Sequence, residues 1–507
     1  MKYLLGLDAG STMCKAALFD TDGNQIAVAG RKQDVLSPHP GWREVNPEGM
    51  WKAAAGAIAE VLAQSGVAAR DVLGLGASGA GNGVYAVDEA GVPVRNGMQS
   101  SDRRATDIVE EWTARGVPEA SYPVCFQGKF PGEMAACLAW MKKHEPEAYR
   151  RIAHVFMVKD YVTYKLTGNF VSDRSDMSGT AVVDLKAGRY SRELVDLYGI
   201  PEMWSALPPM HESYDVVGQV TAEAARATGL LPGTPVVPGL HDMSACAVGS
   251  GAIQENDLVS LAGTLALNEV VLREPPASGF WTICYAVPGY FLSASGGGAS
   301  ALNLEWFVTT CCGEEKALAK ERGISVYDVC NELVAGVSSK GLSVLFHPYV
   351  LGKGGLDHAT AGFYGITSTT TKADLLRAVY EGVVFMHLDG MGLFEAAGIT
   401  PKRAFLAGGG SKSTVWSQMF ADAYSLPLTV AAGSEVGAHG AAMCAGIGTG
   451  VYADFRDAVA KAVTVERHHA PVQADTAVYR ARHAQYLALN EALLEPWKGM
   501  AALAAAK

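Results

Sequence analysis

Asp242 is the residue most suited to chemistry in the segment Pro-Gly-Leu-His-Asp-Met-Ser-Ala, near the middle of the chain. It follows the apolar run 234–238, whose length and β-branched residues predict a buried strand. Because ligands of open α/β sheets bind where strands end, the carboxylate is a candidate for work on a bound ligand. An aspartate in such a place more often only caps the next helix, so its interpretation depends on the other segments.

A second polar turn lies near the N-terminus. Residues 3–7 predict a buried strand, Asp8-Ala9-Gly10-Ser11-Thr12 follows, and residues 16–19 predict the next strand. The turn offers backbone N–H groups, two hydroxyls and the Asp8 carboxylate, which suit nucleotide phosphates with a bridging Mg²⁺, and Lys15 could reach the same oxygens. Taken alone, the stretch fits an ordinary hairpin equally well.

The same theme returns in the second half, where the apolar run 258–262 meets Gly263 and Thr264. Two similar loops indicate a duplicated fold that holds a triphosphate from both sides, although two common strand ends can also repeat by chance. A strand predicted over 404–407 runs into the glycine-rich turn 408–413, which suits close approach by a nucleotide. This turn matches neither the Rossmann fingerprint nor the P-loop.

Three further polar segments lack a defined role. Residues 78–83 form a glycine-rich loop after the strand predicted over 72–76, open to a small ligand. Residues 100–104, Ser-Ser-Asp-Arg-Arg, predict on their own a helix start with a surface ion pair. Residues 173–180 are polar and aperiodic, which predicts a loop beside a site.

Helical periodicity supplies the supporting elements. Asn46 is the expected N-cap of one helix, and Gly168 ends another. Glu435 opens a small-residue helix in which His439 is expected to be a packed histidine rather than a catalyst. Further helices are predicted over 134–144, 147–157 and 159–167.

Composition bounds the class of protein. The chain has 507 residues, 49% hydrophobic and 18% charged, which indicates a globular protein with more than one core. A net charge of −11 argues against nucleic acid or an anionic membrane as the main partner. The nine cysteines form no CxxC pair and no metal-ligand spacing, so reduced thiols are expected. No apolar run approaches membrane-spanning length and the N-terminus does not look like a signal peptide, so a cytoplasmic location is predicted.

In this order, the segments resemble the FGGY family of carbohydrate kinases over nearly the whole chain. Within that family the chain is most similar to the xylulokinase and L-xylulose kinase branch, through Ser101-Asp102-Arg103-Arg104-Ala105, Asn303-Leu304-Glu305-Trp306-Phe307 and Tyr380-Glu381-Gly382-Val383-Val384-Phe385. The matching pieces are Gly6-Leu7-Asp8-x-Gly10-Ser11-Thr12, Lys159-Asp160-Tyr161, Asp173-Arg174-Ser175-Asp176-x-Ser178-Gly179-Thr180, Asp242, Gly263-Thr264, Gly408-Gly409-Gly410 and Glu435. Each piece is weak alone, but their order is specific.

The resemblance implies an α/β fold with two ribonuclease-H-like domains of the actin and hexokinase superfamily and a catalytic cleft between them. The expected domains are residues 1–247, which bind sugar, and residues 248–507, which bind nucleotide. ATP, Mg²⁺ and a small sugar are the expected ligands. Nucleic acid and membrane are not expected partners, and a homodimer is left open.

The resemblance also assigns roles to residues. Asp242 is expected to be the general base, and Asp8, directly or through water, and Asp242 to hold Mg²⁺. The phosphates are expected at Gly10, Ser11, Thr12, Lys15, Gly263 and Thr264, and the adenosine at Gly409 and Ser413. The sugar is expected at Ser78, Asn82, Asp102, Arg103 and Asp242.

The departures from the family pattern lie at the sugar loop. Residues 80–83 read Ala-Gly-Asn-Gly where D-xylulokinases usually carry Gln-Met-His-Gly. With Asp102 expected to neutralise part of the charge of Arg103, a neutral loop carrying Asn82 favours phosphorylation of a ketopentose, D- or L-xylulose, at its terminal hydroxyl. A kinase for another polyol or a sugar acid (erythritol, glycerol, gluconate or ketogulonate) is the alternative, and an inactive nucleotide-gated binding protein or an unproductive ATPase are the others.

Overall fold

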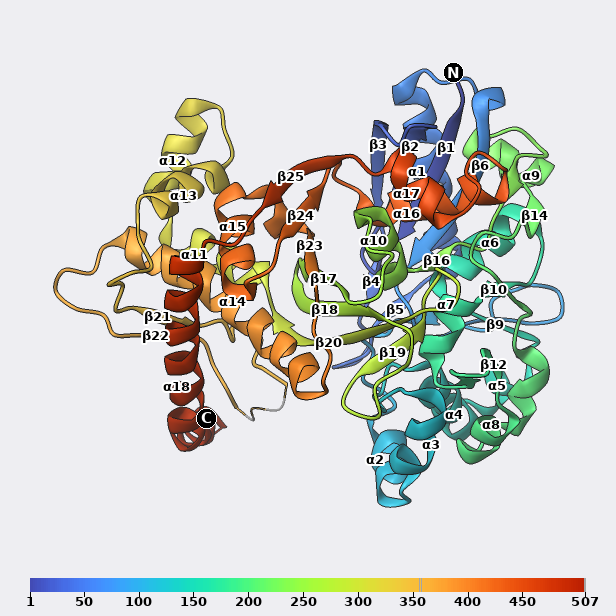
Figure 1. Cartoon of the computed structure of the whole chain (residues 1–507). Coiled ribbons are helices and arrows are strands. Elements are labelled where there is room, and N and C mark those ends of the chain that lie inside the picture. The colour runs from blue at the N-terminus through green and yellow to red at the C-terminus, as the bar shows by residue number, and fades with distance from the viewer. Residues whose placement is uncertain (355, 357, 506–507) are drawn as a thin grey trace. The chain divides into compact units, whose positions relative to one another are not determined.

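The structure is a computed structural model that describes residues 1–354, 356 and 358–505 (Figure 1). The chain divides into two compact units. Unit 1 comprises Met1–Glu255, Val271–Ser293 and Gly433–Thr464, and unit 2 comprises Asn256–Val270, Ala294–Ala432 and Val465–Lys507. Two segments from the second half of the chain therefore join unit 1, in addition to the N-terminal region expected to end near residue 247.

The core of unit 1 is a seven-stranded sheet. Its main path follows the order β14-β15-β6-β1-β2-β3, and β16 also pairs with β6. Strands β1, β2 and β3 form an antiparallel ladder, whereas β1, β15 and β16 each run parallel to β6. The bounds are β1 Tyr3–Ala9, β2 Met13–Asp20, β3 Gln25–Lys32, β6 Val72–Gly79, β14 Gly218–Gln219, β15 Pro235–Val236 and β16 Leu240–His241.

The strand predicted over 234–238 is reduced to β15, and the separate short strand β16 follows it immediately before Asp242. Gly239 lies between them with φ +74, and a Cβ at this position would stand 1.8 Å from the carbonyl oxygen of Ala77. Only glycine allows the chain to pass so close to β6 in this backbone conformation. The break therefore brings β16 back beside the end of β6, where Asp242 follows.

Two small-residue helices, α10 (Asp242–Ser250) and α16 (Val436–Gly448), pack on each other and α16 packs on β1 and β6. A Cβ added to Gly6 of β1 would lie 1.7 Å from the Ala438 carbonyl oxygen, and one added to Gly249 would lie 2.0 Å from another carbonyl oxygen at the start of α16. Backbone therefore meets backbone at these contacts, which explains the small residues of both helices.

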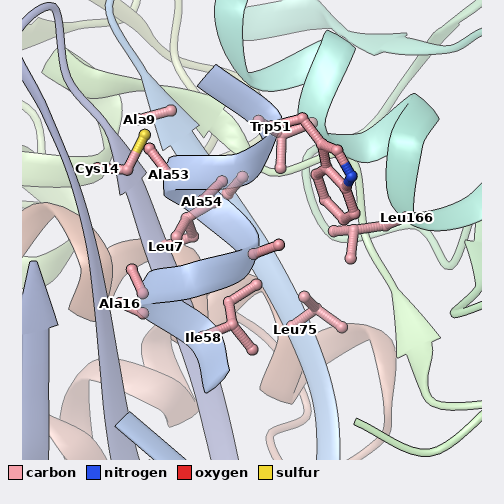
Figure 2. Packing of buried hydrophobic residues seen from close by; sticks show 14 of the residues in the cluster. Leu7, Ala9, Cys14, Ala16, Trp51, Ala53, Ala54, Ile58, Leu75 and Leu166 are labelled. Atoms are coloured by element: carbon pink, nitrogen blue, oxygen red, sulfur yellow. The ribbon is translucent and has the colours of Figure 1, made fainter. Parts of the chain in front are cut away.

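Helix α1 (Pro47–Ser65) begins as predicted at its N-cap Asn46, whose side chain accepts a hydrogen bond from Gly49 N at 3.0 Å. Trp51 and Ile58 lie on its buried face. Figure 2 shows this face against side chains of β1 and β6, in the main hydrophobic cluster of the unit. Burial of this face, rather than helix propensity alone, holds α1 in place.

One predicted helix is largely wrong. Only α5 (Pro146–Arg150) is helical within the segment expected to be helical over 147–157, and β9 (His154–Phe156) follows it. Strand β9 pairs antiparallel with β7 (Tyr85–Val87). This long-range pairing overrides the local pattern, which had no means of revealing it.

The segment 173–180 is not a loop either. Asp173 is the N-cap of α7 (Arg174–Met177) and accepts hydrogen bonds from the backbone N–H groups of the first turn, and the short helix η2 (Ser178–Thr180) follows. The whole stretch is buried apart from the partly exposed Arg174. Its polar side chains therefore serve internal contacts, as the site below makes clear.

The other elements frame these parts. Helices α4 and α6 match their predictions, with Gly168 ending α6 in a left-handed conformation. The remaining helices are α2 Thr106–Ala114, α3 Val117–Cys125, α4 Met134–His144, α6 Val158–Thr167, α8 Arg192–Leu197, α9 Ala222–Thr228, α11 Ala301–Cys311, α12 Gly313–Arg322, α13 Val326–Ala335, α14 Lys372–Ala396, α15 Thr414–Tyr424, α17 Phe455–Ala462 and α18 Gln473–Ala505, with η1 Ala69–Asp71, η3 Pro201–Ala206 and η4 Gly409–Lys412. The minor strands are β4 Val35–Leu36, β5 Glu44–Val45, β8 Gly97–Met98, β10 Ser172–Asp173, β11 Val183–Asp184, β12 Arg189–Tyr190, β13 Met210–His211, β21 Leu345–His347 and β22 Gly362–Tyr364.

A second seven-stranded sheet repeats the plan, in the order β19-β20-β18-β17-β23-β24-β25. Strand β17 is antiparallel to β18 and parallel to β23, just as β1 is antiparallel to β2 and parallel to β6. The bounds are β17 Asp257–Ala262, β18 Leu265–Leu272, β19 Trp281–Cys284, β20 Phe291–Ala299, β23 Arg403–Ala407, β24 Leu428–Ala431 and β25 Val465–His469. The duplicated fold expected from the two strand–glycine–hydroxyl turns is confirmed. Within the described part of the chain, no helix is both long and apolar enough to cross a lipid bilayer.

Candidate active site

Strand register in unit 1 places three candidate residues side by side. Asp8 of β1 is paired with Lys15 of β2 on one side and with Ser78 of β6 on the other. Residues paired across strands present their side chains on the same face of a sheet. The Ser78 hydroxyl donates a hydrogen bond to Asp8 Oδ1 at 3.3 Å. The sheet therefore fixes Asp8 between a cation and a hydroxyl.

Asp242 joins this edge through β16, which pairs with the end of β6. It is the first residue of α10, and its side chain is 43% exposed. The Met243 N–H donates to Asp242 Oδ1 at 2.8 Å, and His241 Nδ1 lies 2.9 Å from the same oxygen. One carboxylate oxygen is thus held by protein, and the exposed side chain remains available to a ligand.

The charges at this edge of the sheet disfavour the ionised form of Asp8. Burial, reinforced by the charges of Asp242 and Glu435 and opposed by Lys15, raises the pKa of Asp8 to about 6. Glu435 precedes α16 and pairs with Lys15, with Oε2 3.0 Å from Nζ. Three carboxylates accompany one lysine here, so added positive charge would stabilise the ionised form of Asp8.

This donor set fits Mg²⁺. The described residues contain no cluster of three or more His, Cys, Asp or Glu side chains arranged as a complete metal site. Mg²⁺ in phosphoryl-transfer enzymes is usually held by one or two carboxylates together with water and substrate phosphates. Asp8 and Asp242 supply such a pair of hard oxygen ligands.

The turn after Asp8 is anchored through its carbonyl groups. Gln33 donates from Nε2 to the Gly10 carbonyl at 2.7 Å and from its backbone N–H to the Thr12 carbonyl at 2.9 Å. Ser11 and Thr12 are exposed, and no hydrogen bond occupies their hydroxyls within the described chain. The turn is therefore rigid, with two hydroxyls free for a ligand.

The loop 78–83, where sugar binding is predicted, is more closed than its sequence indicates. Asn82 is 2% exposed and has φ +65. Its amide donates to the Gly179 carbonyl at 3.0 Å and accepts from Met134 N at 3.4 Å. A Cβ on Gly81 would lie 2.1 Å from His241 Nε2. Asn82 therefore ties the loop to η2 and α4, and Gly81 is the residue that lies against His241.

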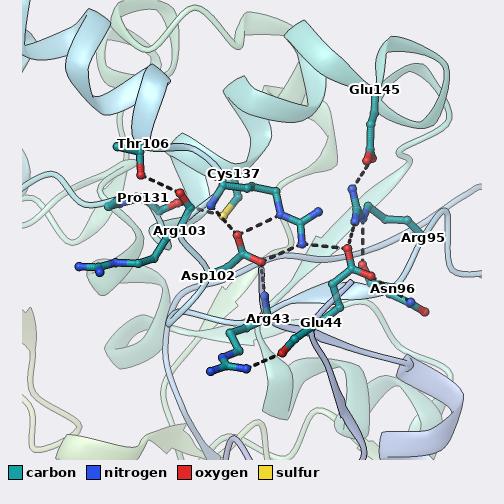
Figure 3. A network of polar contacts seen from close by, with 12 residues as sticks. Arg43, Glu44, Arg95, Asn96, Asp102, Arg103, Thr106, Pro131, Cys137 and Glu145 are labelled. Carbon is teal, nitrogen blue, oxygen red and sulfur yellow. Dashed lines mark hydrogen bonds and ion pairs between the residues drawn. The ribbon is translucent and has the colours of Figure 1, made fainter. Parts of the chain in front are cut away.

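The expected neutralisation of Arg103 by Asp102 is wrong. Asp102 is buried and pairs with Arg104 at 2.8 Å, while its carboxylate also accepts from the backbone N–H of Arg43 at 2.6 Å (Figure 3). Arg104 also pairs with Glu44, and its guanidinium lies 3.7 Å from the centre of a ring of Trp42. This network is structural.

Arg103 has a different environment from its neighbour. Its side chain is exposed and extends away from Asp102 in Figure 3. Among the described residues it forms no ion pair. The one-residue difference arises because Asp102 reaches the side chain two positions later, whose guanidinium also stacks on an aromatic ring.

In unit 2 the two glycine-rich turns come together. A Cβ on Gly408, which has φ +88, would lie 2.9 Å from the Ala262 carbonyl carbon and 3.0 Å from Gly263 N. The carbonyls of Gly263 and Thr264 accept hydrogen bonds at 2.8 and 2.9 Å from the start of α11, and the Thr264 side chain is exposed. The turn containing Gly263 and the turn containing Gly409 therefore form one surface of exposed backbone.

Ser413 lies behind this surface rather than on it. It is 7% exposed, donates to Asn331 Oδ1 at 2.6 Å and accepts from Trp416 N at 3.1 Å as the N-cap of α15. Both functions of its hydroxyl are therefore occupied by protein groups.

A buried charge cluster lies close to His241, and its residues had no predicted role. Lys159 is fully buried, with Nζ 2.6 Å from Asp160, 2.8 Å from Asp173 and 3.5 Å from Asp176. Burial raises the pKa of Asp176 to about 8, although Lys159 opposes this. The sequence could not reveal this cluster because its members come from α6, from α7 and from Asp173, the residue that caps α7, and these segments meet only in the fold.

His241 was also missed. Burial alone would lower its pKa, but the nearby carboxylates of Asp242, Asp176 and Asp173 outweigh burial and raise it. His439, by contrast, is buried and stacked on Phe19 at 4.7 Å between ring centres, and burial lowers its pKa to about 4. It is a packed histidine, as predicted.

Comparison with known proteins gives consistent results. Residues 3–249 match the model of the FGGY family of carbohydrate kinases, N-terminal domain, and residues 258–449 match its C-terminal domain. The chain is 35% identical to the L-xylulose/3-keto-L-gulonate kinase of Escherichia coli (strain K12), covering 90% of each chain. It is 33% identical to a probable L-xylulose kinase of Pasteurella multocida, covering 97% of this chain and 99% of that one. The crystal structure of xylulose kinase from Rhodospirillum rubrum superposes with a TM-score of 0.86 at 30% identity, covering 98% and 100% of the two chains.

Proposed function

The chain belongs to the FGGY family of carbohydrate kinases, and we propose that within it the protein transfers the γ-phosphoryl group of ATP to the terminal hydroxyl of a ketopentose, D- or L-xylulose. Relatives named L-xylulose kinase and xylulose kinase, at 30–35% identity, support this class of substrate. Asp242 carries the proposal, because its carboxylate is exposed and held at one oxygen at the shared end of β6 and β16.

In the proposed mechanism, Asp242 is the general base and takes the proton from the attacking sugar hydroxyl. Phosphoryl transfer needs little covalent help from protein, so the remaining work is positioning and charge stabilisation. Bound Mg²⁺, held by Asp8 and Asp242, would neutralise charge on the phosphates. Lys15 and the hydroxyls of Ser11 and Thr12 offer donors to phosphate oxygens from unit 1.

The nucleotide is proposed to contact the surface of backbone formed by the turns of unit 2. Thr264 contributes the exposed hydroxyl of that surface, and Gly263 and Gly409 contribute backbone that a side chain would cover. Ser413 is proposed to support the turn through its cap of α15 instead of binding adenosine directly.

The sugar is proposed to bind beside Asp242 and Ser78, where Asn82 fixes the loop that faces it. Asn82 thus acts on the shape of the pocket, because its amide already has protein partners. Asp102 likewise supports the adjacent segment through Arg104. This leaves substrate choice to the loop backbone and to exposed side chains nearby.

One observation favours a second candidate substrate, a ketogulonate. Arg103 is an exposed cation without a carboxylate partner in the described chain, and such a cation is what a sugar carboxylate requires. The E. coli relative carries 3-keto-L-gulonate in its name. Arg103→Gln distinguishes the candidates, since it should lower kcat/KM for a ketogulonate and leave xylulose unaffected.

The direct test measures ADP release with D-xylulose, L-xylulose, ketogulonate, gluconate, glycerol and erythritol. The proposal expects a xylulose to give the highest kcat/KM and little ADP without sugar. A sugar acid as the best substrate would replace the ketopentose assignment. ADP release that no sugar stimulates would identify an unproductive ATPase, and no ADP release with any sugar would favour a binding protein.

A further inference from the structure

The side chain of His241 is 2% exposed and its Nδ1 lies 2.9 Å from Asp242 Oδ1. Met243 N lies 2.8 Å from that carboxylate oxygen and 3.2 Å from Nδ1. An ionised carboxylate only accepts hydrogen bonds, so an unprotonated Nδ1 would face it lone pair to lone pair. With a hydrogen on Nδ1, the ring donates to Asp242, and the Met243 N–H, which lies within hydrogen-bond distance of both atoms, donates to the carboxylate oxygen instead of to Nδ1.

We propose that His241 is a positioning residue that fixes one oxygen of Asp242 through its Nδ1–H, so that the other oxygen is aimed at the hydroxyl proton of the bound sugar. The inference rests on the proposed role of Asp242 as general base. A carboxylate at the start of a helix has rotational freedom about its side chain, and one N–H donor from the backbone leaves part of that freedom. A second donor from a buried ring removes it, which matters because small misplacements of a base are costly.

His241 is held through its backbone on one side and through its ring on two others. The backbone N–H of His241 donates to Ser175 Oγ at 3.0 Å, and that hydroxyl donates to Asp173 Oδ2 at 2.5 Å. The indole of Trp281 stands edge-on to the ring, at 5.8 Å between centres. Gly81 covers Nε2 so closely that any Cβ would collide with it. His241 is therefore connected to the buried charge cluster of α6 and α7 and has one orientation.

The same enclosure shows that His241 does not itself contact the sugar. Its Nε2 is buried and has no hydrogen-bond partner among the described residues. Ligand access to that nitrogen is blocked by the backbone at Gly81. Any effect of the ring on catalysis must then pass through Asp242, which distinguishes His241 from a second base or a substrate-binding residue.

A pair of substitutions separates this role from simple packing. In His241→Asn the amide nitrogen occupies about the place of Nδ1, since both are attached to Cγ, and it can still donate to Asp242. In His241→Gln the amide lies farther out, about where Nε2 stands, so the donor to Asp242 is lost. His154→Asn is the matched control. His154 lies in β9, is half-buried, stacks on Phe170 and forms no described contact with Asp242.

The kinetic readout is kcat and KM for xylulose and ATP in the full-length variants. We expect His241→Gln to lower kcat by roughly 10- to 100-fold with both KM values within a few-fold, and His241→Asn to retain most of kcat. Combined with Asp242→Asn, His241→Gln should cause no further loss, because its effect passes through the missing carboxylate. Equal losses for the Asn and Gln variants, or normal kcat for both, would overturn the inference.

The proposed function and this inference fail differently. If Asp242→Asn is nearly as active as the parent protein, Asp242 is not the base and the inference falls with it. If Asp242→Asn is inactive while His241→Gln is normal, the base stands and only the inference is lost. A measurement independent of activity is ¹⁵N NMR of labelled histidine side chains, with His241 assigned from its variant. A protonated Nδ1 is expected at pH 8, and a bare Nδ1 would contradict the geometry.

Discussion

The two sheets carry different side chains at the same topological position. Asp8 and Leu261 each stand two residues before the glycine of the first turn, in β1 and β17. The paired positions across the neighbouring strands are Asp8, Lys15 and Ser78 in unit 1, and Leu261, Leu267 and Ala407 in unit 2. Unit 1 therefore gathers charge at this edge, while unit 2 offers backbone and a hydroxyl in the turn beyond it. The duplication has produced one edge suited to proton and metal chemistry and one suited to holding a ligand.

Asp242→Asn should have the largest effect of these substitutions. It should lower kcat through the charged edge of unit 1 and leave ATP binding nearly unchanged. The amide cannot accept the sugar proton, so kcat falls by roughly 10²-fold or more. The dissociation constant for ATP, measured by titration calorimetry, should change only a few-fold. Turnover close to that of the parent protein would show that Asp242 does not accept the sugar proton.

Asp8→Asn tests the cost of charge at that edge. The pKa of Asp8 is raised in the folded protein from 3.8 to about 6, so the ionised group lowers stability once the pH exceeds both values. The difference corresponds to about 3 kcal/mol. Without Mg²⁺, the variant should be more stable than the parent protein at pH 8 by up to this amount and equal to it near pH 3.5, while kinase activity falls.

Urea unfolding at both pH values measures this effect. A variant that is no more stable than the parent protein at pH 8 would show that Lys15 already compensates for the buried charge. Added Mg²⁺ should stabilise the parent protein more than the variant, which provides the control.

Thr264→Ala tests the edge of unit 2 that is proposed to hold the nucleotide. Loss of one donor to a charged phosphate oxygen costs roughly 1.5–3 kcal/mol, which is about a 10- to 100-fold fall in kcat/KM for ATP. The KM for sugar should stay the same. Ser11→Ala makes the equivalent change in unit 1, and a larger effect there would mean that the charged edge also binds the phosphates more strongly.

Ser413→Ala should have the smallest effect. Its hydroxyl caps α15, so the substitution should reduce stability by about 1 kcal/mol and change the KM for ATP only slightly. Thermal unfolding and ATP kinetics measure the two effects. A fall in ATP use as large as that of Thr264→Ala would instead make Ser413 a nucleotide contact, as the family resemblance implies.

The sequence was most informative where a local signal and the fold agree. The N-cap at Asn46, the stop at Gly168 and the two strand–glycine–hydroxyl turns all depend on neighbouring residues, and all four occur as predicted. Asp242 could be located because a strand end is a local feature with a known relation to ligand sites. Its surroundings depend on β6, β16 and α16, which lie far apart in sequence.

The predictions that failed concern side chains whose partners the sequence does not identify. The partner is either distant in sequence or one of two neighbouring residues of the same kind. Residues 173–180 are predicted to be a loop because nothing in the segment reveals that Lys159 lies buried against it. Asp102 was assigned to Arg103, but burial and stacking on Trp42 favour the next arginine. His241 and Asp242 are neighbours in sequence. The sequence does not show, however, that the histidine ring is enclosed and has one orientation toward the carboxylate.

The contact of Gly6 with the carbonyl of Ala438 also bears on how this protein can change during evolution. Any larger residue at Gly6, or at Gly249 against the first residue of α16, would push α16 away from its neighbour and displace the groups around Asp8 together. These positions can therefore accept almost no variation. The exposed surface at Arg103 has no such constraint. Under the proposed role of Arg103, new sugar preferences can arise by substitution there while the frame that carries the carboxylates is inherited unaltered.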